Sequence, residues 1–239
     1  MNPAALPYRA VAAPLELLRN VPLLSGLSQP ELAAIAALAL RKRYEPRDVV
    51  VQMSDPGGEL FVIVEGHLKV VSAGIDGRDT ALGIMGPGEV FGEVSLLDGG
   101  PRSATVQTLE HCELLVIRRE PFLRFLESSP KTAIALARVL AGMLRKLTER
   151  SEDIAFLRVG DRLAKRLADL ADKYGQKLPG GGIRIRFKLS QQEIGELVSA
   201  TRESANKQIK AWEQEGLLSQ QAGHLVIHDV DRLRMQGGE

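Results

Sequence analysis

The stretch FGEVSLLDGGPRSATV contains side chains and turns suited to binding an anion. It opens with Gly92 and Glu93, and a Gly-Gly-Pro loop then leads to Arg102 and Ser103. Glycine-rich turns bring backbone N–H groups close to an anion, and a guanidinium offers two parallel donors for phosphate oxygens. The hydroxyl of Ser103 and the amides of Ser103 and Ala104 add further donors. This combination predicts a phosphate-binding loop.

Glu93 needs its own explanation, because a carboxylate repels a phosphate. It fits if it binds another group of the same ligand, and a ribose 2′-hydroxyl can donate a hydrogen bond to it. A ligand with both a phosphate and a ribose hydroxyl is a nucleotide. The alternative is a surface salt bridge between Glu93 and Arg102, which contributes at most about 1 kcal/mol. The residue types alone leave both interpretations open.

The C-terminal part of the chain carries signals for two short helices that could bind DNA. Ser190 and Glu193 form a capping box that predicts a helix over 191–198. Thr201 is a suitable cap for a second helix over 202–215. After Gly216, LLSQQAGHLVIHD predicts two strands around an Ala-Gly turn. Two helices joined by a short turn and followed by a hairpin predict a winged helix-turn-helix.

In a helix-turn-helix, the N-terminal residues of the second helix face the base edges. Here these residues are Arg202, Glu203, Asn206 and Lys207. Arginine pairs well with guanine O6 and N7, and glutamate accepts from cytosine N4. The candidates for phosphate contacts are Lys188, Ser190, Gln191, Thr201 and Lys210. The alternative is that this helix simply presents a charged face to solvent.

The elements that must position these residues follow from hydrophobic patterns. Ser28 and Glu31 form a capping box before a helical apolar pattern. From about Arg41 to Arg118, short β-branched runs alternate with turn signals roughly every 8–12 residues, which predicts an antiparallel sandwich or roll. RLAKRLADLADKYG predicts a later helix, and LPGGGIRIRFK a hairpin.

A long helix between Ser129 and Leu157 carries two apolar lines. The first has heptad-like spacing, broken once by Arg150, and consists of Leu136, Leu140, Met143, Leu147, Ile154 and Leu157. The second consists of Ile134, Ala137, Ala141 and Leu144. We expect the second line to pack on the roll and the heptad-like line to pair with a copy of itself. The alternative is that both lines are core of one subunit.

The sequence therefore predicts an α+β protein in four parts. A loose tail occupies 1–14, an antiparallel β-roll of jelly-roll type 15–128, a long dimerisation helix 129–157, and a winged helix-turn-helix 158–239.

Composition excludes several classes of protein. No apolar run approaches the roughly 20 residues that span a membrane, and the start of the chain lacks a secretory pattern, so we expect a cytoplasmic protein. Cys112 is the only cysteine, which excludes an internal disulfide and cysteine-based zinc or iron–sulfur sites. It is either a packed strand residue or a reactive thiol. His224 and His228 would lie about 13 Å apart along a strand, too far for one metal, so no metal is expected.

No set of residues typical of an enzyme is found. The chain has no Ser-His-Asp set, no P-loop and no paired catalytic carboxylates. The net charge is +1, and from Arg158 onwards 14 Lys and Arg face 11 Asp and Glu, a weak preference for an anionic partner.

Three stretches resemble one family. FGEVSLLDGGPRSATV resembles the phosphate-binding cassette of cyclic-nucleotide-binding domains. LLRNVPLLSGLSQPELAAI, the turn-rich roll and LTERSEDIAFLRVGDRLAKRLADLA resemble the bacterial cyclic-AMP receptor / fumarate–nitrate regulator (CRP/FNR) family. QEIGELVSATRESANKQI resembles the helix-turn-helix of that family, so the resemblance covers about residues 15–232.

The resemblance implies a cyclic-nucleotide site. Gly92 would allow close backbone approach, Glu93 would hold the ribose hydroxyl, and Arg102 would pair with the cyclic phosphate. The implied ligand residues are Gly92, Glu93, Val94, Ser95, Arg102, Ser103, Ala104 and Thr148. Serine rather than threonine at 103 favours cyclic AMP, with cyclic GMP as the alternative.

Two residues of the long helix bear on the purine. In the family two successive hydroxyl residues reach it, and here Leu147 and Thr148 stand at those positions. Thr148 would reach a nucleotide bound by the other subunit, or it is merely a tolerated helix threonine. Leu147 is a departure that leaves purine preference open.

The resemblance also implies a dimeric regulator that binds a palindromic TGTGA-like site, with RNA polymerase as a further partner. Arg202 and Glu203 match the family's base-reading residues, whereas Lys207 replaces a frequent arginine and lacks its two-pronged donor. Ser199 stands where the turn often has glycine. The alternative is a regulator of the same fold that is constitutive or answers another ligand, or a redox signal through Cys112.

Overall fold

The fold was analysed in a computed structural model, which describes residues 15–19, 21–24, 26–74 and 79–237. The predicted tail over 1–14 lies outside these residues. The chain divides into two compact units. The first comprises Met1–Ser72 and Ile84–Lys146, and the second Ala73–Gly83 and Leu147–Glu239.

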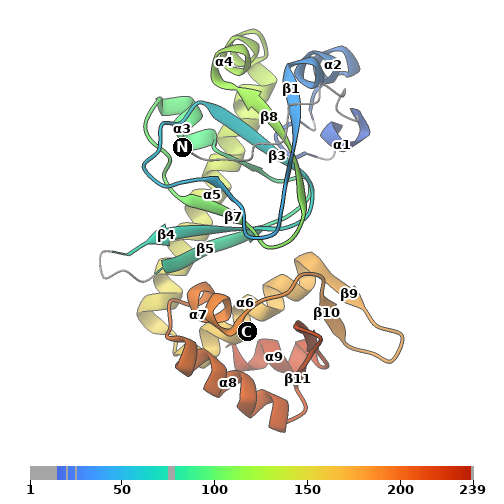
Figure 1. Ribbon diagram of the computed structural model, residues 1–239, viewed down its shortest axis with the longest axis vertical. Helices are drawn as coiled ribbons and strands as arrows, with labels where there is room; N and C mark the ends of the chain where they lie inside the picture. Colours follow the sequence, from blue (N-terminus) through green and yellow to red (C-terminus); the bar gives the residue numbers. More distant parts are fainter. Residues whose placement is uncertain (1–14, 20, 25, 75–78, 238–239) are drawn as a thin grey trace. The chain divides into compact units, whose positions relative to one another are not determined.

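The strands of the roll form two four-stranded sheets (Figure 1). The strands are β1 (Ala39–Tyr44), β2 (Val49–Val51), β3 (Glu59–Glu65), β4 (Leu68–Ala73), β5 (Asp79–Met85), β6 (Val90–Phe91), β7 (Thr105–Thr108) and β8 (Cys112–Arg118). One sheet has the order β1-β8-β3-β6 and the other β2-β7-β4-β5. β1, β3 and β8 pair antiparallel, as do β2, β4 and β7, so the predicted antiparallel roll is confirmed.

β3 and β8 lie between two layers of core, which explains why both are apolar at nearly every position. Leu60 and Val62 belong to one cluster of buried residues, and Phe61 and Ile63 to another. Successive side chains of a strand point to opposite faces, so each strand supplies both clusters. The ring of Phe61 stacks on Phe91 at 4.7 Å between centroids.

Five helices begin in the part of the first unit that the structure describes. They are α1 (Leu15–Arg19), α2 (Gln29–Leu38), α3 (Glu93–Asp98), α4 (Arg119–Ser128) and α5 (Pro130–Phe156). The capping box before α2 is present, because the amide and hydroxyl of Ser28 donate to Glu31 at 2.8 and 2.6 Å. α4 was not predicted; it buries Phe122 against the core that also holds Leu136.

The expectation for the two apolar lines of α5 is wrong in the first half of the helix. Leu136, from the heptad-like line, is 3% exposed in the core of the roll, and Leu140 packs against that core. Ile134 and Leu144, from the other line, are 56% and 66% exposed. The roll covers only the start of α5, so the heptad-like line emerges from the core further along, where Leu147 is 50% exposed.

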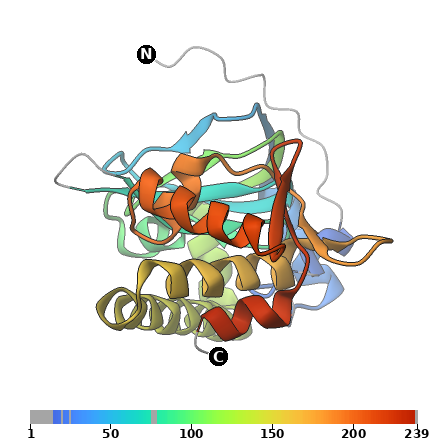
Figure 2. The ribbon, with the colours of Figure 1, turned by 90° about the horizontal axis from the view of Figure 1, so that it is seen from below.

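The second unit has the predicted order of helices and hairpins. Its elements from α6 onwards are α6 (Val159–Tyr174), β9 (Gly175–Lys177), β10 (Ile183–Ile185), α7 (Gln191–Leu197), α8 (Arg202–Gln214), β11 (Leu218–Gln221), β12 (His224–Ile227) and α9 (Val230–Gln236). The strands form one sheet of order β11-β12-β10-β9. α6 contacts both α8 and α9 (Figure 2). α9 was not predicted.

No helix in the described part of the chain is both long and apolar enough to cross a bilayer.

Candidate nucleotide site and nucleic-acid interface

The cassette turns sharply into α3 at a position that only glycine can fill. Gly92 has a φ of +86°, and a Cβ atom there would lie 2.6 Å from the carbonyl oxygen of Glu59 and 2.7 Å from Nη1 of Arg102. The helix ends after six residues at Gly99, whose φ is +73°. The sequence predicted only a short turn here, whereas the structure has the short helix α3 at this place.

Arg102 is a buried guanidinium held at the start of this turn. Its side chain is among the buried polar groups, and Nη1 donates to the carbonyl oxygen of Glu59 at 2.8 Å and to Oγ of Ser95 at 3.1 Å. The guanidinium carbon lies 5.4 Å from the centre of the Phe61 ring. Burial lowers the pKa of Arg102, and the nearby carboxylates of Glu59, Glu93 and Asp55 oppose that shift.

Glu93 is a buried carboxyl with an unused acceptor. It is 6% exposed, and its Oε2 atom has no hydrogen-bond partner among the residues that the structure describes. Burial raises the pKa of Glu93, against the opposing charge of Arg102. No ion pair joins Glu93 to Arg102 in the described residues, and both are buried. The alternative of a surface salt bridge is therefore wrong.

The remaining cassette residues differ in exposure. Ser95 and Ala104 are buried, whereas Val94 and Ser103 are exposed. The amide of Arg102 donates to the carbonyl oxygen of Asp55 at 2.8 Å, which fixes the loop. Beside it opens a depression of about 580 Å³, lined by Arg102 and by Pro56, Gly57, Gly58, Glu59, Arg118, Arg119, Glu120 and Pro121. Thr148 is exposed on the part of α5 that belongs to the second unit.

The predicted caps of the helix-turn-helix are present. Oγ of Ser190 accepts from the amide of Glu193 at 3.2 Å, and Oγ1 of Thr201 accepts from the amide of Ser204 at 3.2 Å. Both helices end one residue earlier than predicted. Ser199, in the turn, has a φ of +51°, the left-handed conformation that favours glycine.

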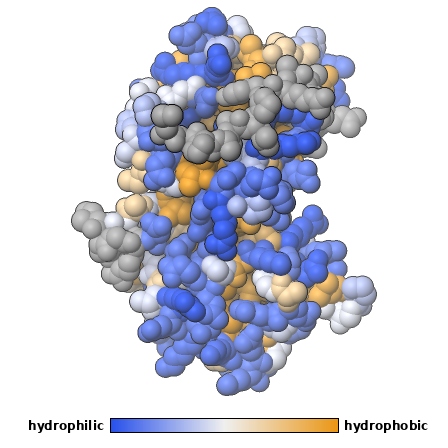
Figure 3. Space-filling model, in the orientation of Figure 1, coloured by the Kyte–Doolittle hydropathy of each residue, from blue (hydrophilic) through white to orange (hydrophobic). Residues whose placement is uncertain are grey.

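α8 has one buried face and one exposed face. Ala205, Ile209 and Trp212 are buried, whereas the side chains of Arg202, Glu203, Lys207 and Lys210 are exposed and Asn206 is half-buried. Gln191, the first residue of α7, is half-buried, and Lys188 is exposed against Gly223 at the tip of the β11–β12 hairpin. Hydrophilic side chains cover α7 and α8 on the face drawn in Figure 3.

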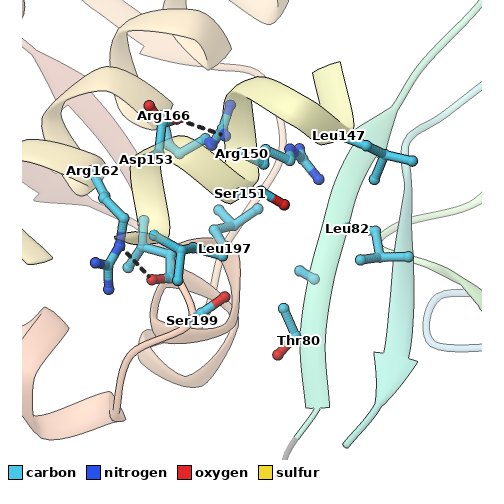
Figure 4. A pocket seen from close by; sticks show the side chains of 13 residues that line it. Thr80, Leu82, Leu147, Arg150, Ser151, Asp153, Arg162, Arg166, Leu197 and Ser199 are labelled. Atoms are coloured by element: carbon cyan, nitrogen blue, oxygen red, sulfur yellow. Dashed lines mark hydrogen bonds and ion pairs between the residues drawn. The ribbon is translucent and has the colours of Figure 1, made fainter. Parts of the chain in front are cut away.

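Sequence reasoning treated Arg150 only as a break in the heptad-like line. Arg150 lines a cavity of about 150 Å³ whose lining residues all belong to the second unit, among them Leu147, Ser151, Asp153, Arg162 and Arg166 (Figure 4). Its guanidinium reaches β5, because Nη2 lies 3.3 Å from the place of a Cβ atom on Gly83. Burial lowers the pKa of Arg150 to about 10, with the charge of Arg166 adding to the effect.

Cys112 and two of the histidines, His67 and His224, lie in ordinary packed surroundings, whereas His111 and His228 are exposed. Cys112 is buried in β8, and burial raises the pKa of its thiol to about 12. Nδ1 of His67 lies 2.5 Å from Glu110, and Nδ1 of His224 lies 3.0 Å from the carbonyl oxygen of Ile185. Among the described residues, no group of three or more His, Cys, Asp or Glu is arranged to hold a metal.

Comparison with known proteins assigns both sites to domains of one protein family. Residues 41–129 match the model of the cyclic nucleotide-binding domain, and residues 161–235 match the Crp-like helix-turn-helix domain. A CRP-like cAMP-activated global transcriptional regulator of Mycobacterium tuberculosis is 33% identical over 223 residues, 91% of this chain and 97% of its own. The chain belongs to the CRP/FNR family of transcription regulators.

Other relatives of this CRP/FNR protein differ in the nucleotide that their names give. The cyclic AMP receptor protein of Thermus thermophilus is 28% identical over 213 residues, 89% of this chain and 95% of its own. The solved structure of the c-di-GMP responsive global regulator CLP of Xanthomonas campestris matches with a TM-score of 0.74. It is 28% identical and covers 84% of this chain and 100% of its own. This CRP/FNR chain therefore combines a cyclic-nucleotide-binding domain with a DNA-binding domain, in a family of transcription regulators.

Proposed function

We propose that this protein is a cytoplasmic homodimeric regulator that binds cyclic AMP in the roll and then binds a palindromic, TGTGA-like DNA site. The observation that carries the nucleotide part is the presence of a buried guanidinium and a buried carboxyl in one cassette. Arg102 and Glu93 are each 6% exposed, and Oε2 of Glu93 has no partner in the described part of the chain. An unpartnered buried polar atom is unfavourable, so it points to a ligand that completes it.

The proposed roles follow the chemistry of each group. A ribose hydroxyl donates to Oε2 of Glu93, and the guanidinium of Arg102 turns from Ser95 and Glu59 to pair with the cyclic phosphate. Ser103 and Ala104 contribute a hydroxyl and amides, and Gly92 lets the backbone approach the ligand closely. Val94 and Ser95 complete the cassette, and Thr148 of the partner chain reaches the purine.

The names of the relatives support cyclic AMP as the effector and give one alternative. The regulators of M. tuberculosis and T. thermophilus are named for cyclic AMP, whereas the CLP structure is described as c-di-GMP responsive. The second candidate function is thus a regulator of the same fold that answers another cyclic nucleotide. A redox signal through Cys112 is disfavoured, because a buried thiol with a pKa of about 12 is almost never the reactive thiolate.

The DNA part rests on the exposed start of α8. Arg202 and Glu203 would read base edges, with Asn206 and Lys207 beside them, and Thr201, Ser190 and Lys210 would contact phosphates. Two copies would pair through the exposed apolar side chains of α5. The nucleotide would favour the arrangement in which the two recognition helices lie one turn of DNA, about 34–36 Å, apart.

Calorimetric titration of the full chain with cyclic AMP, cyclic GMP and cyclic di-GMP tests the effector. We expect cyclic AMP to bind at micromolar concentration or tighter, and Arg102→Ala to weaken binding about 100-fold or more, since charge-assisted hydrogen bonds are lost. Arg124→Ala, an exposed arginine of α4, is the matched control and should bind as the wild type. Binding of cyclic di-GMP alone would identify the second candidate, and binding of no nucleotide would overturn the cassette assignment.

Site selection from a random duplex library tests the DNA part. We expect a palindrome with TGTGA-like half-sites, and loss of preference at one base pair per half-site in Arg202→Ala, at a cost of about 1–3 kcal/mol. Unchanged preference in that variant would show that Arg202 does not read a base.

A further inference from the structure

The side chain of Arg202 is held by a residue of the preceding helix. Nε of Arg202, the first residue of α8, donates to Oε1 of Gln191, the first residue of α7, at 3.4 Å. Within the described residues this is the hydrogen bond that the guanidinium makes, and no ion pair engages it. The side chain of Arg202 is exposed, so an unheld guanidinium would sample several rotamers.

The backbone fixes the two ends of this hydrogen bond relative to each other. A Cβ atom on Gly195 of α7 would lie 3.0 Å from the carbonyl oxygen of Ala200 and 3.2 Å from the amide nitrogen of Arg202, so the helices meet closely. The amide of Ala200 also donates to the carbonyl oxygen of Gly195 at 3.0 Å. The capping box of Ser190 fixes the start of α7, immediately before Gln191.

The hydrogen bond to Gln191 limits which nitrogens of the Arg202 guanidinium can bind DNA. With Nε occupied, the donors left for DNA are those on Nη1 and Nη2, at the end of the side chain. These two nitrogens form a pair that can bind O6 and N7 of one guanine. We propose that Gln191 is a positioning residue, which holds Nε of Arg202 so that Nη1 and Nη2 meet a single guanine end-on. This inference rests on the proposed DNA reading by Arg202.

A phosphate contact is the competing role for Gln191, and comparing the alanine and glutamate variants separates the two, because only a positioning residue loses base preference with alanine and keeps it with glutamate. A carboxylate in place of the amide still accepts from Nε of Arg202, and more strongly because it is charged. It would repel a DNA phosphate. Gln191→Glu should therefore keep the base preference at the Arg202 position while binding all duplexes more weakly.

The experiment measures binding of the full chain, with and without cyclic AMP, to its selected duplex and to duplexes changed at single base pairs. The variants are Gln191→Ala, Gln191→Glu, Arg202→Ala and the double variant with alanine at both positions. Gln192→Ala is the matched control, because Gln192 bonds to Glu196 within α7.

We expect Gln191→Ala to reduce discrimination at the Arg202 base pair by about 3- to 10-fold and to leave the other base pairs unchanged. In the double variant the loss at this base pair should not exceed that of Arg202→Ala, because coupled residues are not additive. Gln192→Ala should leave discrimination unchanged.

Three results would overturn the inference. If Gln191→Ala weakens binding to every duplex equally and leaves the base preference unchanged, Gln191 is a phosphate contact. If Arg202→Ala itself leaves the base preference unchanged, the proposed reading by Arg202 fails and the inference fails with it. Loss of the preference in Arg202→Ala but not in Gln191→Ala would leave the proposed function intact and refute the positioning role alone.

Discussion

An ionised carboxylate buried away from water is unfavourable unless a charged or hydrogen-bonding group pairs with it, and Glu93 is only partly paired. Its burial raises the pKa of Glu93, and none of the described residues provides a partner for Oε2. At the scale of single residues, the ligand-free protein therefore carries a local instability that binding would remove. A nucleotide that binds only the folded state would therefore raise the free energy of unfolding.

Glu93→Gln tests this instability. Because the folded pKa of Glu93 lies above its unfolded value, the folded state binds the proton more tightly. The contribution of Glu93 is therefore most favourable at acidic pH and is lost as the pH rises through the folded pKa. We expect Glu93→Gln to raise the free energy of unfolding by about 1 kcal/mol at pH 7 and by less at pH 5.

Urea unfolding of wild type and variant at both pH values is the measurement for Glu93→Gln. The same variant should bind cyclic AMP about tenfold more weakly, because a neutral amide is a poorer acceptor. An equal change in stability at both pH values would contradict the burial of an ionisable carboxyl.

At the scale of elements, the turn between α7 and α8 stores strain. Ser199 has a φ of +51°, and Ser199→Gly should raise the free energy of unfolding by about 0.5 kcal/mol, since glycine adopts this conformation freely. Gly216 has a φ of +67° in open space, and Gly216→Ala should lower it by about 1 kcal/mol. Opposite signs in urea unfolding are expected; a loss of stability in Ser199→Gly would mean that Ser199 makes a compensating contact.

The junction of α5 and α6 depends on one buried carboxylate. Asp153 accepts from Nζ of Lys165 at 2.9 Å and from Nη2 of Arg166 at 3.2 Å, and its own side chain is 8% exposed. We expect Asp153→Ala to destabilise the second unit by about 2 kcal/mol, because its ion pairs with Lys165 and Arg166 are lost while Arg166 keeps its pair with Asp169. Glu152→Ala, at an exposed neighbour, should change the free energy of unfolding by less than about 0.5 kcal/mol in the same urea titration.

The accuracy of the sequence-based predictions also varies with the type of element. Capping boxes at Ser28 and Ser190 were readable because they depend on residues three positions apart. Helix α4 was missed because no capping side chain marks its start. Helix α9 was missed because it is short and is stabilised by contacts distant in the chain, such as Arg234 with Asp172 at 2.7 Å.

The chemistry of the sites could be predicted where the residues lie close together in the sequence. The cassette residues lie within thirteen positions, so their types and order were visible. Three features of the sites could not be predicted, because they depend on how distant parts of the chain pack together. They are the unpaired oxygen of Glu93, the cavity around Arg150 and the hydrogen bond between Gln191 and Arg202.

At the scale of the whole molecule, the exposed apolar side chains of α5 indicate that a second protein surface packs against this helix. Ile134 and Leu144 are 56% and 66% exposed, more than isolated core-forming residues of a monomer would be. We expect the double change Ile134→Glu and Leu144→Glu to convert the dimer into a monomer in sedimentation equilibrium. Lys146→Glu, an exposed residue on another side of the helix, is the control and should remain a dimer. A dimeric double variant would place the interface elsewhere.

Helix α5 also has a consequence for insertions and deletions. It runs unbroken from Pro130 to Phe156, and the border between the two units falls inside it, after Lys146. Each residue of an α-helix adds a rotation of about 100° and a rise of about 1.5 Å. One residue inserted at this border would therefore turn the second half of α5 by about 100° against the first. Seven residues would come within about 20° of two full turns, so the phase of the helix, more than its length, limits which insertions this chain tolerates.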